Sequence, residues 1–261
     1  MNAQENSIRN QVRQCVPFLR RFGRAALGRQ DQADQCVLQI MHDVLTDHAI
    51  MSTASTPRSA LYRRMAATLG SSSYGYPTLQ SRQSYWLSAV EGFAEDEVAE
   101  IIDVAPSEVK YLNAVARREN DMRMGSDILI IEDEFFIAKD LKNIVMGMGH
   151  NVCGIARTHK EAIIRHNRHA PDLVLSDVQL ADGSSGIEAI QEIERTHPIP
   201  HIFITAFPER FLTGNGAEPI FIISKPFRRE EIKATISQAL FIHACPLSPD
   251  HASDARANRL T

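Results

Sequence analysis

The sequence predicts a two-part protein: an all-α N-terminal half with a helix-turn-helix, followed by a doubly wound α/β domain with a five-stranded parallel sheet. Residues 1 to about 120 carry apolar side chains at three- and four-residue steps, the spacing of amphipathic helices. After residue 126, short runs rich in Ile and Val alternate with helical segments, as in parallel sheets buried on both faces. The length of 261 residues also exceeds the roughly 100 to 150 residues of most single domains.

The first 50 residues are expected to form two helices joined near Gly28, and we assign residues 1–50 to one helical module. The segment 51–59 is small, polar and contains a proline, which is typical of a connector. A second helical group follows, interrupted by the turn-rich segment 70–77. The N-terminal half is therefore predicted to consist of helices alone.

The second module, residues 51–118, ends in a compact helical pattern. One periodic helix is predicted over 81–93, a short one over 95–102, and a third that opens at Pro106 and runs to about Arg118. Proline suits the first turn of a helix, because its missing N–H would have no acceptor there. Helix, short helix, tight turn and helix together predict a helix-turn-helix.

The C-terminal half is predicted to alternate strands and helices. The apolar runs expected to form strands are 128–131, 152–156, 173–175, 202–204 and 220–223. A charged segment ending in Gly-Ser, residues 119–126, is the expected linker, and the α/β domain then spans 127–244. Residues 245–261 are polar and are expected to form a loose tail. Ligands of such a sheet bind at the carboxyl ends of its strands.

Composition and charge exclude several classes of protein. With 44% hydrophobic and 23% charged residues, the chain is of the globular type. Its N-terminus lacks the pattern of a secretory signal and no long apolar stretch occurs, so we expect a cytoplasmic protein without membrane contact. The cysteines lack the spacing of zinc sites and are expected to be reduced; they are Cys15, Cys36, Cys153 and Cys245. A net charge of −4 does not favour general binding to nucleic acid.

Polar side chains follow four of the predicted strands, where the strands' carboxyl ends meet at one edge of the sheet. These residues are Glu132, Asp133, Asp177, Thr205 and Lys225. Three carboxylates held together repel one another, and the pKa of one would rise unless a cation neutralises them. Oxygen ligands without histidine or cysteine select a hard ion, and Mg²⁺ is the expected one because it also holds phosphate oxygens.

Within this site Asp177 is the expected nucleophile, because it ends the central strand ahead of a flexible DGSSG loop. An aspartyl phosphate would form there. Asp133 is expected to bind the ion directly, Glu132 directly or through water, and the backbone carbonyl of Gln179 to complete the shell.

Two further groups are expected to contact the phosphoryl oxygens, the ammonium of Lys225 and the hydroxyl of Thr205. Pro226 follows the lysine, and its peptide bond is a candidate for the cis form. Phosphatases of the haloacid dehalogenase type also form an aspartyl phosphate, but they carry Asp-x-Asp after the first strand. Phe135 stands at the second position after Asp133 here, which excludes that class.

Residues 127 to 241 resemble the receiver domain of two-component signalling, because Glu-Asp, Asp, Thr and Lys-Pro end four different strands in the right order. The resemblance implies the flavodoxin-like strand order 2-1-3-4-5, and a histidine kinase or phosphotransfer protein as phosphodonor. It also implies catalysis of the domain's own phosphorylation and dephosphorylation only, and not enzyme turnover. Phe207 lies where receivers often carry an aromatic switch, although an isolated phenylalanine is more often a core residue. His166 and His169 are interpreted as part of a solvated helix face, because no third metal ligand lies nearby.

The N-terminal half resembles the two modules of an extracytoplasmic-function sigma factor, with VPFLRRFGRAALG (16–28) like region two and residues 84–118 like the region-four helix-turn-helix. Together with a receiver that reads FITAFPERFLTG, the chain is similar to the PhyR family of general stress response regulators. That resemblance implies an anti-sigma factor of the NepR type as partner, bound after phosphorylation frees the sigma-like half. The implied function is that of an anti-anti-sigma factor.

The charge of the helix-turn-helix argues against DNA as its ligand. Between residues 91 and 108 the segment has no Lys or Arg, and its acids are Glu91, Glu95, Asp96, Glu97, Glu100, Asp103 and Glu108. Facing a polyanion they would oppose the electrostatic attraction that supplies most non-specific affinity. Two alternatives stay open: a DNA-binding transcription regulator with a C-terminal receiver, and an enzyme that turns over a phosphoester.

Overall fold

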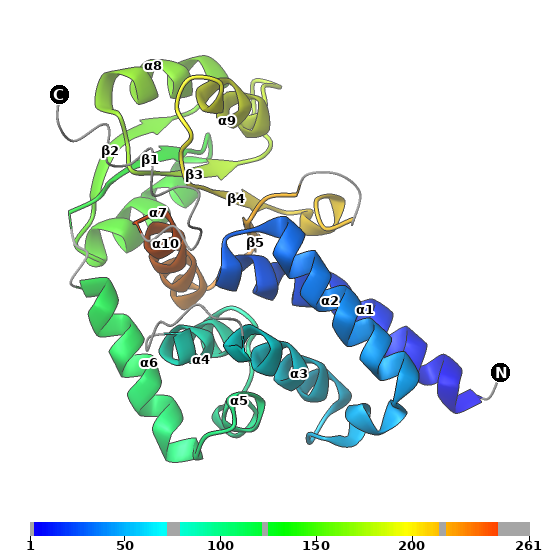
Figure 1. The fold of residues 1–261 in the computed structure, drawn as a ribbon. Helices are drawn as coiled ribbons and strands as arrows, with labels where there is room; N and C mark the ends of the chain where they lie inside the picture. The colour runs from blue at the N-terminus through cyan, green and yellow to red at the C-terminus, as the bar shows by residue number, and fades with distance from the viewer. Residues whose placement is uncertain (1–2, 72–78, 122–124, 214–217, 245–261) are drawn as a thin grey trace, which may run out of the picture.

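The computed structural model of the chain describes residues 3–71, 79–121, 125–213 and 218–244. Within them the predicted fold class is confirmed: a helical N-terminal half precedes a doubly wound domain with five parallel strands in the order β2-β1-β3-β4-β5. Figure 1 shows the helical half packed beside the sheet domain. The predicted tail, Cys245 and residues 72–77 of the turn-rich segment lie outside the described residues.

The N-terminal half is helical throughout its described residues. Its elements are α1 (Ala3–Leu27), α2 (Gln30–Thr46), the 3-10 helix η1 (His48–Ser52), α3 (Pro57–Ser71), α4 (Leu79–Ala89), α5 (Glu95–Ile102) and α6 (Pro106–Asp121). α1 and α2 lie side by side, and Gly28 between them adopts a left-handed conformation with φ +68°. Glycine does so without strain, so the predicted joint near Gly28 is confirmed.

Two helix ends differ from the prediction. α4 ends at Ala89 rather than continuing to residue 93, because Gly92 takes a left-handed conformation with φ +75° that a helix cannot continue through. α6 runs on to Asp121 and so includes the first residues of the predicted linker. Glu119 forms an ion pair with Arg82 of α4 at 3.1 Å, which anchors this last turn.

The C-terminal half alternates strands with helices as predicted. Its elements are β1 (Asp127–Ile131), α7 (Phe135–Gly147), β2 (Asn151–Ala156), α8 (His159–His169), β3 (Leu173–Asp177), α9 (Gly186–Glu194), β4 (His201–Thr205), the 3-10 helix η2 (Pro208–Arg210), β5 (Phe221–Ser224) and α10 (Arg229–Ala244). Alternate strand residues point to opposite faces, so the sheet needs cover on both. α8 and α9 cover one face and α7 and α10 the other (Figure 1).

The connection from β4 to β5 departs from the doubly wound pattern. Parallel strands are usually joined by an α-helix, but the described residues between Thr205 and Phe221 contain only η2. The apolar side chains of Phe211 and Leu212 pack on the sheet here instead of a helix. We refer to residues 206–213 and 218–220 as the β4–β5 segment.

α10 is largely buried between the sheet and the helical half. Its residues from Glu231 to Phe241 are buried with the exception of Lys233, unlike those of a surface helix with one apolar face. Gln238 Nε2 donates to the carbonyl of Ala25 in α1 at 2.7 Å, and the Arg82 guanidinium of α4 lies 3.6 Å from the centre of the Phe241 ring. The two halves therefore share one continuous apolar core.

No helix among the described residues is both long and apolar enough to span a membrane.

Candidate functional site

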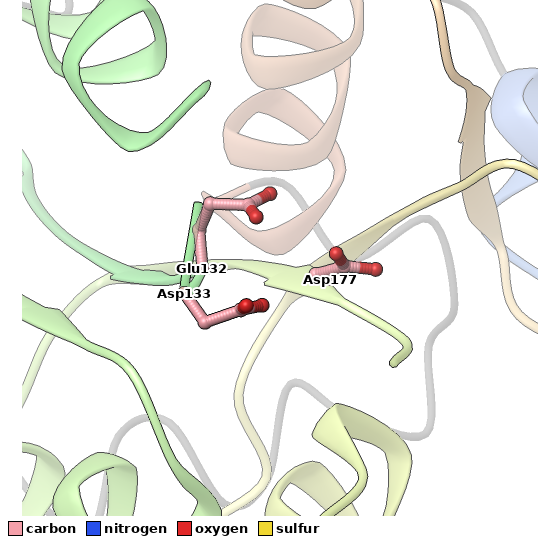
Figure 2. Close-up of side chains that lie close together, drawn as sticks. All are labelled: Glu132, Asp133 and Asp177. Atoms are coloured by element: carbon pink, nitrogen blue, oxygen red, sulfur yellow. The ribbon is translucent and has the colours of Figure 1, made fainter. Parts of the chain in front are cut away.

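Three carboxylates meet at the carboxyl ends of β1 and β3. Glu132 and Asp133 follow β1, and Asp177 ends β3, which is paired directly with β1. One carboxylate oxygen from each lies within 4.8 Å of the other two. Figure 2 shows the three side chains close together. This all-oxygen donor set matches the preference of hard divalent cations, so the three residues can hold such a metal.

Lys225 completes the cluster from the end of β5. Its Nζ lies 2.7 Å from Oδ2 of Asp177 and 2.9 Å from Oε2 of Glu132. The backbone fixes its position, because the Lys225 N–H donates to the carbonyl of Thr205 at 2.7 Å. The peptide bond from Lys225 to Pro226 is cis, the form for which it was a candidate. One ammonium thus neutralises part of the charge of three acids.

The electrostatics of the pair Glu132 and Lys225 follow from burial and from mutual attraction. The Glu132 side chain has no exposed surface. Burial raises the pKa of its carboxyl, Lys225 pulls the pKa down, and the charge of Asp177 adds to the rise. Burial alone would lower the pKa of Lys225, but its hydrogen bonds to Asp177 and Glu132 outweigh burial and raise it. The ammonium is therefore held in its charged form.

The remaining predicted residues border this cluster. The Gln179 N–H donates to Oδ1 of Asp177 at 3.1 Å. Thr205 is buried at the end of β4, next to the strand that carries Asp177, and its hydroxyl accepts a hydrogen bond from the N–H of Phe207 at 3.1 Å. Phe207 itself is exposed, with the Arg210 guanidinium 4.6 Å from its ring centre.

The prediction of a solvated face for His166 was wrong. His166 is buried, because α8 packs against the region of α9, and its ring centre lies 6.1 Å from that of His197. His169 is exposed, as expected. Among the described residues, the only group of His, Cys, Asp or Glu side chains able to hold a metal is Glu132, Asp133 and Asp177.

One of the seven acids of the helix-turn-helix is not a surface charge. Glu91 is buried, and its carboxylate accepts hydrogen bonds from Arg21 of α1 at 2.9 Å, Tyr62 of α3 at 2.7 Å and Trp86 of α4 at 3.1 Å. It therefore joins three helices. The prediction that Glu91 adds to the negative surface of the helix-turn-helix was wrong, because these partners stabilise its charge inside the protein.

Several other acids of this segment stabilise local structure while they lie at the surface. Glu97 and Glu108 accept the N–H groups of Ala94 and Ala105 at the starts of α5 and α6. Lys110, one of the few bases of α6, pairs with Glu95 at 3.5 Å. The surface of α5 and the start of α6 is thus acidic, and its nearest base is partly neutralised.

A buried ion-pair network that sequence reasoning missed links the two halves. Glu218 of the β4–β5 segment pairs with Arg24 at 2.5 Å and with Arg20 at 3.1 Å, both on α1. Arg20 also pairs with Asp34 of α2 at 2.7 Å, and the Glu218 N–H donates to Oε1 of Gln30. The partners lie almost 200 positions apart in the sequence, so no local pattern could have indicated them.

Comparison with known proteins accounts for nearly the whole chain. Models of three domains match: the Sigma2 domain of PhyR at residues 12–66, the sigma-like domain of response regulator PhyR at 78–121, and the response regulator receiver domain at 128–237. The phyllosphere-induced regulator PhyR of Methylorubrum extorquens is 41% identical over 248 residues, covering 88% of this chain and 93% of that protein. The chain belongs to the PhyR family of response regulators.

Solved structures of PhyR proteins have the same architecture. The anti-anti-sigma factor PhyR from Bartonella quintana is 39% identical and superposes with a TM-score of 0.84 over 95% of this chain and 99% of that one. The same protein is also known in complex with the anti-sigma factor NepR, at 40% identity, 89% and 98% coverage and a TM-score of 0.41. A PhyR architecture thus combines a sigma-like half with a receiver, as the sequence predicted.

Proposed function

We propose that this PhyR-family chain is a phosphorylation-activated anti-anti-sigma factor, whose sigma-like half sequesters an anti-sigma factor once Asp177 carries a phosphoryl group. The observation that carries the proposal is that one domain holds both features. Its carboxylates and Lys225 form a cluster suited to a phosphoryl group, and its β4–β5 segment is ion-paired to the sigma-like half. One chain thus holds both a phosphorylation site and an ion pair between its halves that phosphorylation can disturb.

In the proposed chemistry the Asp177 carboxylate attacks the phosphorus of a phosphohistidine on a histidine kinase or phosphotransfer protein. A P–O bond to Asp177 forms while the P–N bond of the donor breaks, and the donor's imidazole is the leaving group. Asp177, Asp133 and Glu132 would hold Mg²⁺, with the carbonyl of Gln179 as a further ligand. When bound, the ion supplies positive charge to the phosphoryl oxygens. Lys225 already contacts Asp177 at 2.7 Å, so it needs only a small movement to pair with a phosphoryl oxygen. The domain would catalyse its own phosphorylation and dephosphorylation and no further turnover.

The proposed signal runs from Thr205 through the β4–β5 segment to α1. In the present structure the Thr205 hydroxyl accepts from the N–H of Phe207, so it would leave that contact in order to donate to the phosphoryl group. Glu218, further along the same β4–β5 segment, pairs with Arg24. Moving one end of this segment strains the other. Converting a 1:99 ratio of open to closed into 99:1 requires about 5.5 kcal/mol of differential stabilisation.

The proposed partner is an anti-sigma factor of the NepR type, as for the Bartonella quintana relative. DNA binding is not favoured. The surface of α5 is acidic, Lys110 pairs with Glu95, and Arg117 of α6 faces the receiver, 3.4 Å from Glu230. A DNA-reading helix directs its bases toward phosphates and base edges.

The test uses Asp177→Asn and, as a matched control, Asp182→Asn, which changes an exposed acid five residues further on in the same loop. We expect phosphoryl uptake from a small-molecule donor with Mg²⁺ to be lost in the first variant and kept in the second. Complex formation with the anti-sigma factor, followed by size exclusion, should show the same pattern. Equal labelling of both variants would refute the assignment of Asp177.

A further inference from the structure

The turn between β2 and α8 lies beside the acid cluster. β1 and β2 are parallel neighbours, with Ile131 paired to Ala156, so the residues that follow them leave the same edge of the sheet. The pairing continues one residue beyond β1, because the Glu132 N–H donates to the carbonyl of Ala156 at 2.9 Å. Arg157, the first residue after β2, is thereby brought next to Asp133.

Arg157 contacts Asp133 through the main chain of the acid. Its Nη2 donates to the Asp133 carbonyl at 3.2 Å, and Arg157 is an exposed residue. Asp133 belongs to neither β1 nor α7, which begins at Phe135. The hydrogen bond therefore acts on the backbone of a connecting residue, and the carboxylate of that residue is one of the three in the acid cluster.

The turn that carries Arg157 is itself fixed by capping of α8. The Thr158 side chain accepts the N–H of Glu161 at 3.2 Å, and Oε2 of Glu161 accepts the N–H of Arg157 at 2.9 Å. Reciprocal capping of this kind fixes the backbone where the chain enters a helix. The guanidinium thus reaches Asp133 from a backbone position that is already held.

The same turn also contacts the loop that follows Asp177. The His159 N–H donates to Oγ of Ser184 at 3.2 Å, and this hydroxyl donates to Asp182 at 2.6 Å. The turn therefore contacts both chain segments from which acids of the cluster project. Hydrogen bonds to groups that carry metal ligands orient those ligands without touching the ion.

We propose that Arg157 is a positioning residue for the metal site, because its hydrogen bond to the Asp133 carbonyl holds the Asp133 carboxylate toward Glu132 and Asp177. The inference rests on the proposed function, since it concerns the ion that phosphoryl uptake would use. It adds a residue that acts through Asp133 and contacts neither the ion nor the phosphoryl group.

The guanidinium has two effects on cation binding, and their signs are opposite. Its positive charge repels a divalent cation, so loss of the charge alone would strengthen binding. Loss of the hydrogen bond frees the Asp133 backbone and weakens binding. The hydrogen bond dominates, because Arg157 is exposed and solvent screens its charge. The sign of the change in affinity therefore separates positioning from simple electrostatics.

The experiment measures binding of Mn²⁺ to the full chain by electron paramagnetic resonance, which counts the free ion. Mn²⁺ shares the preference of Mg²⁺ for oxygen ligands. Arg157→Met removes the donor and the charge, whereas Arg157→Lys keeps a charged donor. Lys160→Met is the matched control, because it removes another exposed positive charge from the start of α8. Binding that Asp133→Asn abolishes is assigned to the acid cluster, and circular dichroism verifies the fold.

We expect Arg157→Met to bind Mn²⁺ about tenfold more weakly than the unaltered chain, Arg157→Lys to stay within about threefold, and Lys160→Met within about twofold. In phosphoryl uptake from acetyl phosphate, the Mg²⁺ concentration that gives half the maximal rate should rise about tenfold in Arg157→Met, while the rate at saturating Mg²⁺ is unchanged.

Two results would contradict the proposal in different ways. Equal affinities of Arg157→Met and Lys160→Met, or tighter binding by Arg157→Met, would overturn the positioning role and leave the proposed function standing. An unaltered chain whose Mn²⁺ binding does not depend on Asp133 would overturn both the positioning role and the proposed metal site.

Discussion

Replacing Glu218 by alanine should open the protein without phosphorylation. The carboxylate is buried and pairs with two guanidinium groups of α1, and the Arg24 side chain has no exposed surface. Burial lowers the pKa of Arg24 despite the opposing effect of Glu218. Its Nη2 has no hydrogen-bond partner within the part of the chain that the structure describes. Glu218 is therefore the acid that compensates the charge of the buried Arg24 guanidinium.

The free-energy cost of Glu218→Ala to the closed form comes from leaving Arg24 buried without its counter-charge. Removing one partner of a buried ion pair costs about 3 to 5 kcal/mol. The cost applies to the closed arrangement, because Arg24 reaches water once α1 leaves the β4–β5 segment. A shift of about 4 kcal/mol multiplies the ratio of open to closed roughly a thousandfold, which converts a 1:99 mixture into a mostly open one.

The assay is binding of the anti-sigma factor to the unphosphorylated variant, measured by titration calorimetry with no phosphodonor present. Asp31→Ala is the matched control, because it removes an ion pair between two exposed side chains. The Asp31 carboxylate lies 2.9 Å from the Arg29 guanidinium. We expect binding by Glu218→Ala and none by the control. A folded Glu218→Ala protein that still requires phosphorylation to bind would refute the role of this ion pair.

Three further predictions concern the interface and the phosphorylation site. Arg228→Ala removes a 2.7 Å hydrogen bond to the carbonyl of Ala89 at the end of α4, costs the closed form about 1 to 3 kcal/mol, and should raise unphosphorylated binding less than Glu218→Ala in the same calorimetric assay. Phe136 is 82% exposed beside the acid cluster, so Phe136→Ala should slow phosphoryl transfer from a protein donor while uptake from acetyl phosphate is unchanged; equal slowing in both would contradict a docking role. Burial, aided by Glu230, raises the pKa of Tyr85 to about 12, so its contribution to the closed form is complete below pH 10 and is lost as the pH rises from 10 to 12. Tyr85→Phe should flatten that loss in a circular dichroism titration; an unchanged titration would show that other groups cause it.

The strands and the polar groups that follow them could be predicted because both depend on local pattern. Short apolar runs indicated all five strands, and parallel strands bring their carboxyl ends to one edge whatever their loops do. Glu132, Asp177 and Lys225 therefore meet although 93 positions separate the first from the last. This arrangement of side chains depends on the sheet and not on which ion or phosphodonor binds. It could therefore be predicted from the residue types and their positions after the strands.

Long-range pairing could not be predicted in the same way. Glu91 stands in a run of acids and was interpreted as one of them, whereas its three partners come from three different helices. The sequence around Glu218 carries no pattern that indicates a buried ion pair. Its partners belong to the opposite end of the chain. His166 was misinterpreted because α8 packs its face against the neighbouring helix rather than exposing it. Only tertiary contact distinguishes these residues from ordinary surface charges.

The described part of the connection from β4 to β5 contains only the 3-10 helix η2, and this limits how freely the two halves can be exchanged between proteins. α1 packs against β5. Glu218, three residues before β5, pairs with Arg24 of α1. A receiver that carries a full helix between β4 and β5 would have to place it close to α1, and we expect the two helices to compete for the same space. The receiver and the sigma-like half therefore depend on each other for their packing. We expect a chimera either to lack the closed form or to stay closed after phosphorylation.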